Sequence, residues 1–268
     1  MGKNKEPRVL FKYRHFDSAG YHLKSLEEMY FTPPEKFNDP FDTALPVLYH
    51  SSNSTPDQIL EHMRRQNSVL FSPPRPDSQI VQDWKKFIEK ISINLIEAQA
   101  IDQKQAETNA KETGAFSLAA QESNILMWSH YGLNHSGFCI GYRTNVLYEA
   151  LRSHAQVVLT PIEYHKECPV INPYDPNLSI DDWFGPFKVK HSDWAYEKEW
   201  RLILLKGASE IIPIPENAIE SIYLGMRISK ADEELLLNKI RSRKYPVDLF
   251  RARPKFNCFD LTFEKERY

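Results

Sequence analysis

The chain has 268 residues, of which 41% are hydrophobic, and its 34 Lys and Arg residues nearly balance its 36 Asp and Glu residues. This length allows one large domain with a sizeable core, and the net charge of −2 argues against a dedicated nucleic-acid-binding protein, which usually carries a basic stripe. An enzyme that acts on nucleic acid through a local patch is still compatible with this balance.

The cysteines and the hydropathy pattern indicate a cellular setting. Cys139, Cys168 and Cys258 lie far apart and form no Cys-x-x-Cys pair, which argues against a zinc site and against a disulfide framework. The residues up to Pro7 are polar, and no run of 18 apolar residues occurs. We therefore expect a cytoplasmic protein without a membrane partner and without a bound metal.

Short elements are expected in the first part of the chain. A strand is predicted at 9–13, a short helix at 23–28 and a second strand at 29–32, which two prolines end. The sequence Phe-Asn-Asp-Pro-Phe-Asp at 37–42 predicts a turn, because Asx side chains and proline favour turns.

Helices are predicted next in the chain. The Thr-Pro-Asp-Gln sequence from Thr55 supplies a cap, a proline at the first helical position and a glutamine three residues after the cap, so a helix should run to about residue 67. Apolar residues at helical spacing from Gln79 predict another helix, whose polar continuation ends at Gly114. We expect residues 50–113 to form a helical insertion.

The remainder of the chain is predicted to be rich in strands. These strands are expected at 115–119, 137–143, 157–164, 199–205, 219–224, 247–251 and 258–263. Helices are expected at 123–134, 145–154 and 230–244, the last with Ser229 as its cap and Asp232 three residues on. Because the connections are uneven and rarely of the βαβ type, the pattern predicts an α+β fold. We expect a mixed, largely antiparallel sheet in one domain spanning residues 1–268.

The segment from Trp194 to Arg201 is the strongest candidate for a functional site. Read as a strand, it places Glu197, Glu199 and Arg201 on one face, with the two carboxylates about 7 Å apart. Three aromatic residues accompany them, and a carboxylate pair in such a setting is a candidate for a perturbed pKa. The alternative is a salt-bridged strand face.

Three further groups of residues have both a structural and a functional interpretation. Helical spacing would bring Trp128, Tyr131 and His135 to one face, either as part of the core or as the wall of a ligand pocket. Alternation in the first strand would separate Lys12 and Arg14 from Tyr13, so the two cations either face solvent or meet a phosphate or the carboxylate pair. Asn38 and Asp39 either stabilise a turn or contact a ligand.

These groups occur together in an order that resembles a widespread bacterial family, domain of unknown function 2971. The matching motifs are an early Lys-Tyr-Arg strand, the Phe-Asn-Asp-Pro-Phe-Asp turn, a Phe-Ser strand, Met-Trp-x-His-Tyr-x-x-x-His-x-Gly and Lys-x-x-x-Trp-x-x-Glu-x-Glu-Trp-Arg. Here they are found at 12–14, 37–42, 116–117, 127–137 and 190–201. The resemblance spans roughly residues 8–228 and implies no function by itself.

A second resemblance is to ADP-ribosyltransferases of the Arg-Ser-Glu type, through a basic first strand, an aromatic-Ser strand and a Glu-x-Glu strand. It implies an enzyme that uses NAD as its substrate, with Arg14 and Ser117 shaping the NAD site. Glu199 would stabilise the ribosyl cation, and Glu197 would orient or deprotonate the acceptor. The family's Ser-Thr-Ser sequence is Phe-Ser-Leu-Ala here.

The expected function is therefore ADP-ribosyl transfer to a protein or nucleic acid, in a bacterial toxin or phage-defence effector. Tyr131 and Trp128 would form the pocket wall beside the bound nucleotide. One alternative is a hydrolase or nuclease that uses Glu197, Glu199, Asp39 and His135. The other is a non-catalytic protein that senses or binds a ligand through the same pocket.

Overall fold

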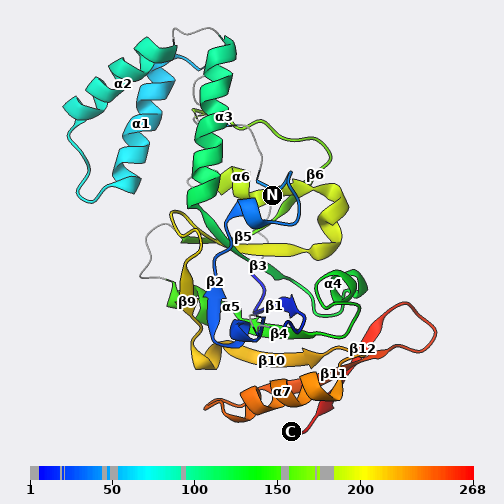
Figure 1. Cartoon of the computed structure of the whole chain (residues 1–268). Helices are drawn as coiled ribbons and strands as arrows, with labels where there is room; N and C mark the ends of the chain where they lie inside the picture. Colours follow the sequence, from blue (N-terminus) through cyan, green and yellow to red (C-terminus); the bar gives the residue numbers. More distant parts are fainter. Residues whose placement is uncertain are drawn as a thin grey trace.

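A sheet of eight strands forms the centre of the molecule (Figure 1). The computed structural model describes residues 6–18, 20, 22–43, 47–48, 54–91, 95–151, 157–172, 174–175 and 184–268. The strands lie in the order β12-β11-β10-β4-β1-β3-β8-β5. Their bounds are β1 Val9–Arg14, β3 Gly114–Ala119, β4 Phe138–Arg143, β5 Val157–Pro161, β8 Glu199–Leu204, β10 Ile219–Leu224, β11 Asp248–Pro254 and β12 Leu261–Glu266.

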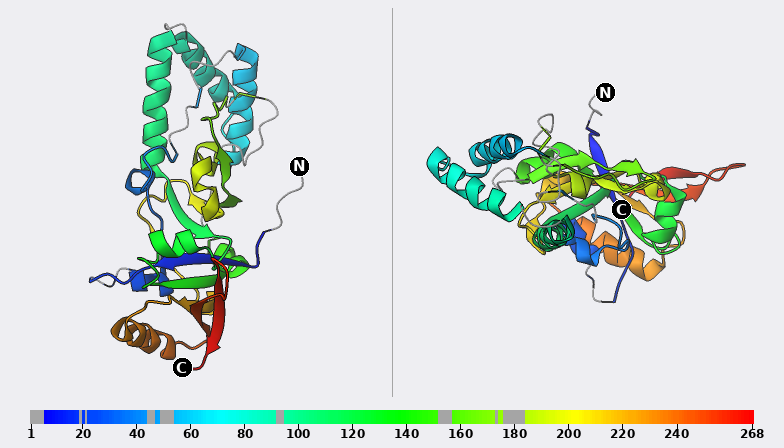
Figure 2. Two further views of the ribbon diagram at one scale, coloured as in Figure 1. Left: turned by 90° about the vertical axis from the view of Figure 1, so that its right-hand side faces the viewer. Right: turned by 90° about the horizontal axis from the view of Figure 1, so that it is seen from above.

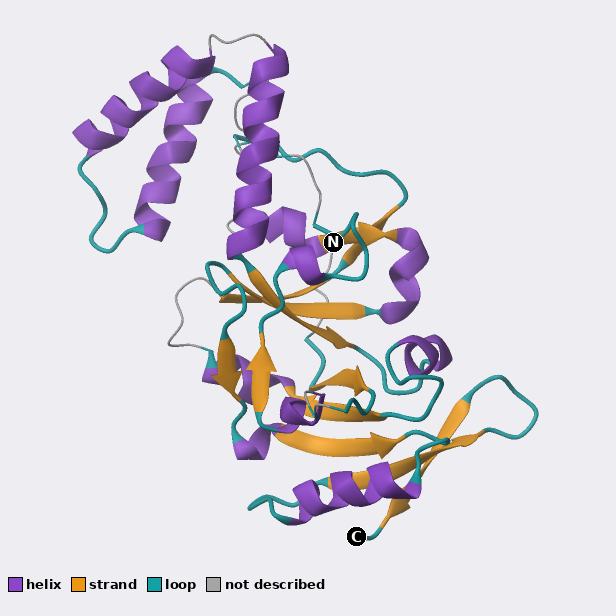
Figure 3. Ribbon diagram, in the orientation of Figure 1, coloured by secondary structure: helices purple, strands orange, loops and turns teal. Residues whose placement is uncertain are grey.

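The pairing confirms the predicted α+β class with a mixed, largely antiparallel sheet. Within this sheet the strands pair antiparallel, except that β10 and β11 run parallel and are connected by helix α7 (Lys230–Arg241). The Ser229 side chain caps α7 by accepting a hydrogen bond from the Asp232 backbone, as the sequence predicts. Figure 3 shows α7 beside the strands at the C-terminal end of the molecule.

Two smaller two-stranded sheets flank the central one. The first pairs β2 (Glu28–Tyr30) with β9 (Ile211–Pro213), and the second pairs β6 (Glu163–His165) with β7 (Val189–His191). The predicted strand at 157–164 is thus divided between β5 and β6, which belong to different sheets. The predicted strand at 258–263 begins later, at Leu261, because Cys258 and its neighbours form the turn between β11 and β12.

The helices α1 (Pro56–Leu70), α2 (Asp77–Ile91) and α3 (Leu95–Glu112) lie between β2 and β3 in the chain and project away from the central sheet (Figure 2). Thr55 and Gln58 form the predicted capping box of α1. The expectation of one long helix from Gln79 to Gly114 is wrong, since α2 and α3 are separate helices. Two parts of the predicted insertion, residues 50–53 and 92–94, lie outside the described residues. No described helix has the length and apolar character required to cross a membrane.

Short helices connect the remaining strands. The expected helix at 123–134 is much shorter, because α4 ends at His130 and the chain then enters left-handed conformations at Leu133, Asn134 and His135. These short helices are η1 His22–Leu26, η2 Pro34–Lys36, α4 Ile125–His130, α5 Thr144–Ala150, α6 Gly185–Lys188, η4 Ser192–Glu197 and η5 Glu216–Ala218.

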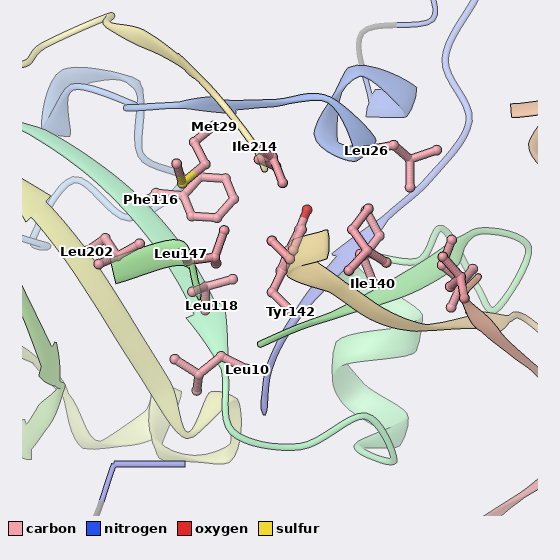
Figure 4. Close-up of a cluster of buried hydrophobic side chains, with 14 of the residues drawn as sticks. Leu10, Leu26, Met29, Phe116, Leu118, Ile140, Tyr142, Leu147, Leu202 and Ile214 are labelled. Carbon is pink, nitrogen blue, oxygen red and sulfur yellow. The ribbon is translucent and has the colours of Figure 1, made fainter. Parts of the chain in front are cut away.

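One face of the central sheet packs on the main hydrophobic core. Alternation along β1, β3 and β4 directs Leu10, Leu118 and Ile140 into this core, where they meet residues of η1, α5 and the loop after β9 (Figure 4). Tyr142 is fully buried there, and its hydroxyl donates a hydrogen bond to the Ser25 carbonyl at 2.5 Å. The opposite face has a smaller cluster that includes Phe11 and Tyr13.

The central sheet is split between β1 and β3. These strands share a single paired register, Phe11 opposite Ala119, whereas the first half of β3 bridges to Thr32 in the segment after β2. Beyond Phe11 the strands therefore separate toward Arg14. This split opens the sheet at its centre, beside the Glu199 end of β8.

Candidate functional site

A cavity of about 280 Å³ lies at the split between β1 and β3. It collects residues from all five of the sequence motifs. Its lining consists of Phe11, Lys12, Tyr13, Arg14, Thr32, Lys36, Phe37, Asn38, Asp42, Ser117, Leu118, Ala119, Met127, Tyr131, Lys190, Glu197, Glu199 and Arg201.

The strand registers determine from which side each residue enters the cavity. Ser117 lies opposite Arg201, and Ala119 lies opposite Glu199, so these side chains share one face of the sheet. Lys12 and Arg14 alternate with Phe11 and therefore project from the other face. The split allows both sets of side chains to reach the same cavity.

Glu197 and Glu199 do not lie on one continuous strand, as the sequence was expected to place them. Glu197 is the last residue of the 3-10 helix η4, and Lys198 adopts a left-handed conformation with φ of 45° before β8 begins at Glu199. The η4 helix is held by Asn124, whose side chain donates a hydrogen bond to the Tyr196 carbonyl at 2.6 Å. Despite this kink, both carboxylates point into the cavity.

Arg201 joins the two carboxylates of Glu199 and Asp42. Its Nε and Nη2 donate to the Glu199 carboxylate at 2.7 and 3.0 Å, and its Nη1 and Nη2 donate to the Asp42 carboxylate at 2.8 and 2.5 Å. The Phe37 ring covers the guanidinium at 5.2 Å from its centroid. Glu199 and Arg201 therefore form a salt bridge, which is the alternative interpretation that the sequence left open.

Lys190 lies among three carboxylates. Its Nζ is 2.6 Å from Glu197, 3.3 Å from Glu199 and 3.6 Å from Asp42. Burial lowers the pKa of Lys190, but these three carboxylates more than offset that effect and raise it. Lys190 therefore stays charged and holds Glu197 beside the Arg201 group.

Glu197 is the less constrained of the two glutamates. One of its oxygens accepts a hydrogen bond from the Tyr131 hydroxyl at 2.6 Å, and the other accepts from Lys190. Asn38 in turn donates to the Tyr131 hydroxyl at 3.2 Å. Since a carboxylate oxygen has two acceptor sites, each Glu197 oxygen keeps one acceptor site beyond these bonds.

The two glutamates differ in protonation behaviour. Burial raises the pKa of Glu197, and Lys190 only partly opposes this effect. Burial also acts to raise the pKa of Glu199, but Arg201 and Lys190 lower it to about 2. Glu199 also accepts a hydrogen bond from the Ser117 side chain. Glu197, Glu199, Asp42, Lys190 and Arg201 together form a buried group that we call the acidic cluster. Its three carboxylates outnumber its two basic groups, so it has one negative charge in excess.

The structure brings eight of the eleven predicted site residues to the cavity. They are Tyr13, Arg14, Asn38, Ser117, Tyr131, Glu197, Glu199 and Arg201.

The other three predicted residues, Asp39, Trp128 and His135, are not in the cavity lining. Trp128 was expected to form the pocket wall, but it is fully buried, and its indole donates to the Glu122 carbonyl. His135 stacks on Trp128 because the chain turns after α4. The Asp39 carboxylate accepts from the Phe41 backbone and stabilises the turn.

Sequence reasoning missed Asp42 and Lys190 as site residues. Both belong to quoted motifs, as the last residue of the Phe-Asn-Asp-Pro-Phe-Asp turn and the first residue of the 190–201 motif. Their position in those motifs was the available signal, but their common partner Arg201 was not visible in the local sequence. Among the described residues, no group of three His, Cys, Asp or Glu is arranged to hold a metal ion.

The comparisons with other proteins identify a family without a known function. No curated protein and no solved structure matches the chain. Residues 127–202 contain two of the five sequence motifs and contribute six cavity residues, which are Met127, Tyr131, Lys190, Glu197, Glu199 and Arg201. These residues match the family described as Protein of unknown function (DUF2971), and the family predicted from the motifs is thereby confirmed.

Proposed function

We propose that this protein is an ADP-ribosyltransferase-like enzyme that binds NAD, breaks its nicotinamide–ribose bond and transfers ADP-ribose to a protein or nucleic acid. The observation that carries this proposal is the meeting of Arg14, Ser117 and the Glu197/Glu199 pair at one cavity, although they come from three distant parts of the chain. A role as a bacterial toxin or phage-defence effector is part of the same proposal.

The size of the cavity suits a ligand of which only one end is enclosed. At about 280 Å³ it lies near the lower limit of small-molecule sites, which is about 300 Å³. The nicotinamide and its ribose would fit inside, and the rest of the dinucleotide would extend outward. Tyr131 lines the cavity with its hydroxyl on Glu197, and it supplies an aromatic surface beside that carboxylate.

Cleavage requires a negative group beside the ribose. As the bond breaks, its electron pair goes to the nicotinamide nitrogen, and positive charge develops on the ribose until the acceptor attacks. Glu199 is poorly suited to this task, because Arg201 and Lys190 already engage its carboxylate. We therefore assign the stabilisation of this charge to Glu197, and we assign the positioning of β8 to Glu199.

The proposal is tested by incubating the protein with NAD and measuring the release of nicotinamide and the labelling of added protein or nucleic acid. Glu197→Gln keeps the shape of the side chain and one acceptor oxygen but removes the negative charge, and it should lower the rate by about 10²–10³-fold. Glu264→Gln, the same change on an exposed strand of the sheet, serves as the matched control and should leave the rate unchanged.

Absence of nicotinamide release together with absence of NAD binding by calorimetry would contradict the proposal. Tight NAD binding without any turnover would instead favour the second candidate, a non-catalytic protein that senses or binds a nucleotide. The observation that favours this second candidate is the double pairing of Arg201, which neutralises much of the carboxylate charge in the cavity.

A further inference from the structure

The cavity contains two lysines with opposite surroundings. Lys190 is surrounded by three carboxylates. Lys12, by contrast, forms no ion pair within the described part of the chain. Its Nζ donates a hydrogen bond to the Ser117 carbonyl at 2.6 Å and lies 4.1 Å from the centroid of the Phe116 ring. These contacts are with neutral groups, so the charge of a protonated Lys12 has no counter-charge at hydrogen-bond distance.

The nearest strand neighbour on the same face makes this imbalance larger. Arg14 lies two residues further along β1, so it projects from the same side as Lys12 and lines the same cavity. The Nε of Arg14 donates to the Ser25 hydroxyl at 2.8 Å, and among the described residues no carboxylate forms an ion pair with it. Two basic side chains that form no ion pair with a described carboxylate thus share one end of the cavity, although the charge of Asp17 partly opposes the effect of burial on the pKa of Arg14.

Burying two like charges side by side is unfavourable unless an anion joins them. We propose that Lys12 and Arg14 form a subsite for an anionic group of the ligand, a phosphate or a carboxylate, and that Lys12 takes up a proton as this group binds. The subsite stands independently of the glycosidic chemistry proposed above, because it depends on charge pairing and not on which bond is broken.

Proton uptake follows from the groups that face Lys12. Burial lowers the pKa of Lys12 well below its ordinary value, and Arg14 on the same strand lowers it further, whereas Glu199 from β8 acts in the opposite direction. From β3 the Ser117 carbonyl and the Phe116 ring contact the amine, and Cys139 of β4, which pairs with Tyr13, is a thiol whose pKa burial raises. An anion beside the amine would favour the charged form and so bind a proton with it.

The charges at the two ends of the cavity also indicate how charge should be distributed on the ligand. The acidic cluster enters the cavity from the opposite face of the sheet and has one negative charge in excess, whereas Lys12 and Arg14 form the basic end. A ligand with an anionic group at one end and a positive, or developing positive, charge at the other would satisfy both ends. A binding experiment with both kinds of anion distinguishes a phosphate from a carboxylate at the basic end.

Calorimetry on the full chain tests this subsite. Inorganic pyrophosphate and, in a separate arm, benzoate are titrated at pH 7 in two buffers with different ionisation enthalpies. If Lys12 takes up a proton from the buffer when the anion binds, the measured heat of binding will differ between the two buffers. The size of this difference gives the number of protons taken up. Binding of pyrophosphate alone would assign the subsite to phosphate groups, and binding of benzoate alone would assign it to carboxylates.

Lys12→Met keeps an unbranched side chain one atom shorter than that of lysine and removes its charge. It should weaken binding of the preferred anion by about 10- to 100-fold and abolish the buffer dependence. Lys239→Met removes one exposed charge from α7 and should change neither quantity. Thermal unfolding of both variants checks their fold, and proton uptake by the unaltered chain is a readout that needs no variant.

The subsite is overturned if neither anion binds at millimolar concentration, or if an anion binds without proton uptake and Lys12→Met binds it equally well. Its failure is distinct from failure of the proposed function. A chain that binds pyrophosphate with proton uptake but releases no nicotinamide from NAD supports the subsite and contradicts the transferase. A chain that releases nicotinamide from NAD but binds neither anion supports the transferase and overturns the subsite.

Discussion

Two arginines on the same sheet bind carboxylates in opposite environments. Arg201 on β8 contacts Glu199 and Asp42, and the exposed fractions of these three side chains are 1%, 6% and 2%. Arg253 on β11 contacts Glu264 on β12, and these side chains are 48% and 62% exposed. The chemical groups are the same, but Arg201 engages two carboxylates through four hydrogen bonds and Arg253 engages one carboxylate through one, so the two pairings differ in burial and in the number of contacts.

This difference determines what each pairing can do. An exposed pair exchanges its contacts with water at little cost, and its net contribution to stability is small. Each member of a buried pair has lost its hydration, so removal of one partner leaves the other without compensation. The acidic cluster is therefore a rigid unit within which Glu197, which is bonded to Tyr131 and Lys190 but not to Arg201, remains the most available carboxylate.

The largest expected effect comes from Arg201→Met. The substitution leaves Glu199 and Asp42 buried, with only Lys190 to offset them, so the free energy of unfolding should fall by about 3–5 kcal/mol. Denaturant unfolding followed by circular dichroism measures this change. Arg201→Lys keeps the charge but lacks the planar fork, and it should also lose stability. A loss below about 1 kcal/mol for Arg201→Met would remove the contrast between the two arginines.

An intermediate effect is expected from acid. The pKa of Glu199 is about 2 in the folded state, below its ordinary value of 4.5, so the unfolded chain binds more protons. The stability that Glu199 contributes is fully present above pH 4.5 and is lost as the pH falls from 4.5 toward about 2. The raised pKa of Glu197 acts in the opposite direction, because its protonation begins earlier in the folded state.

The acid effect is measured by denaturant unfolding at pH 7, 4.5 and 3. Glu199→Gln should flatten the dependence of stability on pH below 4.5, whereas the matched Glu264→Gln should leave it as in the unaltered chain. Equal slopes for the chain and for Glu199→Gln would mean that the pairing of Glu199 with Arg201 does not stabilise the folded state.

The smallest effect is expected from Arg253→Met at the exposed pair. Its free energy of unfolding should stay within about 0.5 kcal/mol of the unaltered chain, since water replaces the lost contact with Glu264. The same denaturant experiment measures it. A change as large as that of Arg201→Met would show that position in the sheet, and not burial, determines the strength of these pairings.

Local sequence patterns predicted most elements of the fold. The strands β3, β4 and β10 lie within one residue of their expected bounds, since apolar and β-branched residues between turns define them. The signals at Thr55 and Ser229 identified the starts of α1 and α7 because capping depends only on neighbouring residues. The division of 79–113 into two helices was missed, since both parts have residues compatible with a helix.

The candidate site was predicted less completely, for a physical reason. Alternation correctly joined Glu199 with Arg201, but it could not anticipate the left-handed Lys198, which places Glu197 outside the strand. Asp42 meets Arg201 across a separation of 159 residues, and no local pattern encodes such a contact. Of the two aromatic residues predicted to form the pocket wall, Tyr131 lines the cavity, whereas the short helix α4 turns Trp128 into the core.

The bond between Asp42 and Arg201 closes a chain loop that contains α1–α3 and β3 to β7. The entropy cost of closing such a loop rises only slowly with its length, so the projecting helices add little to the cost of joining its ends. The segment 127–202 that matches the family supplies the arginine but not Asp42. A fragment restricted to that segment would retain the charged strand without the residues that close its site.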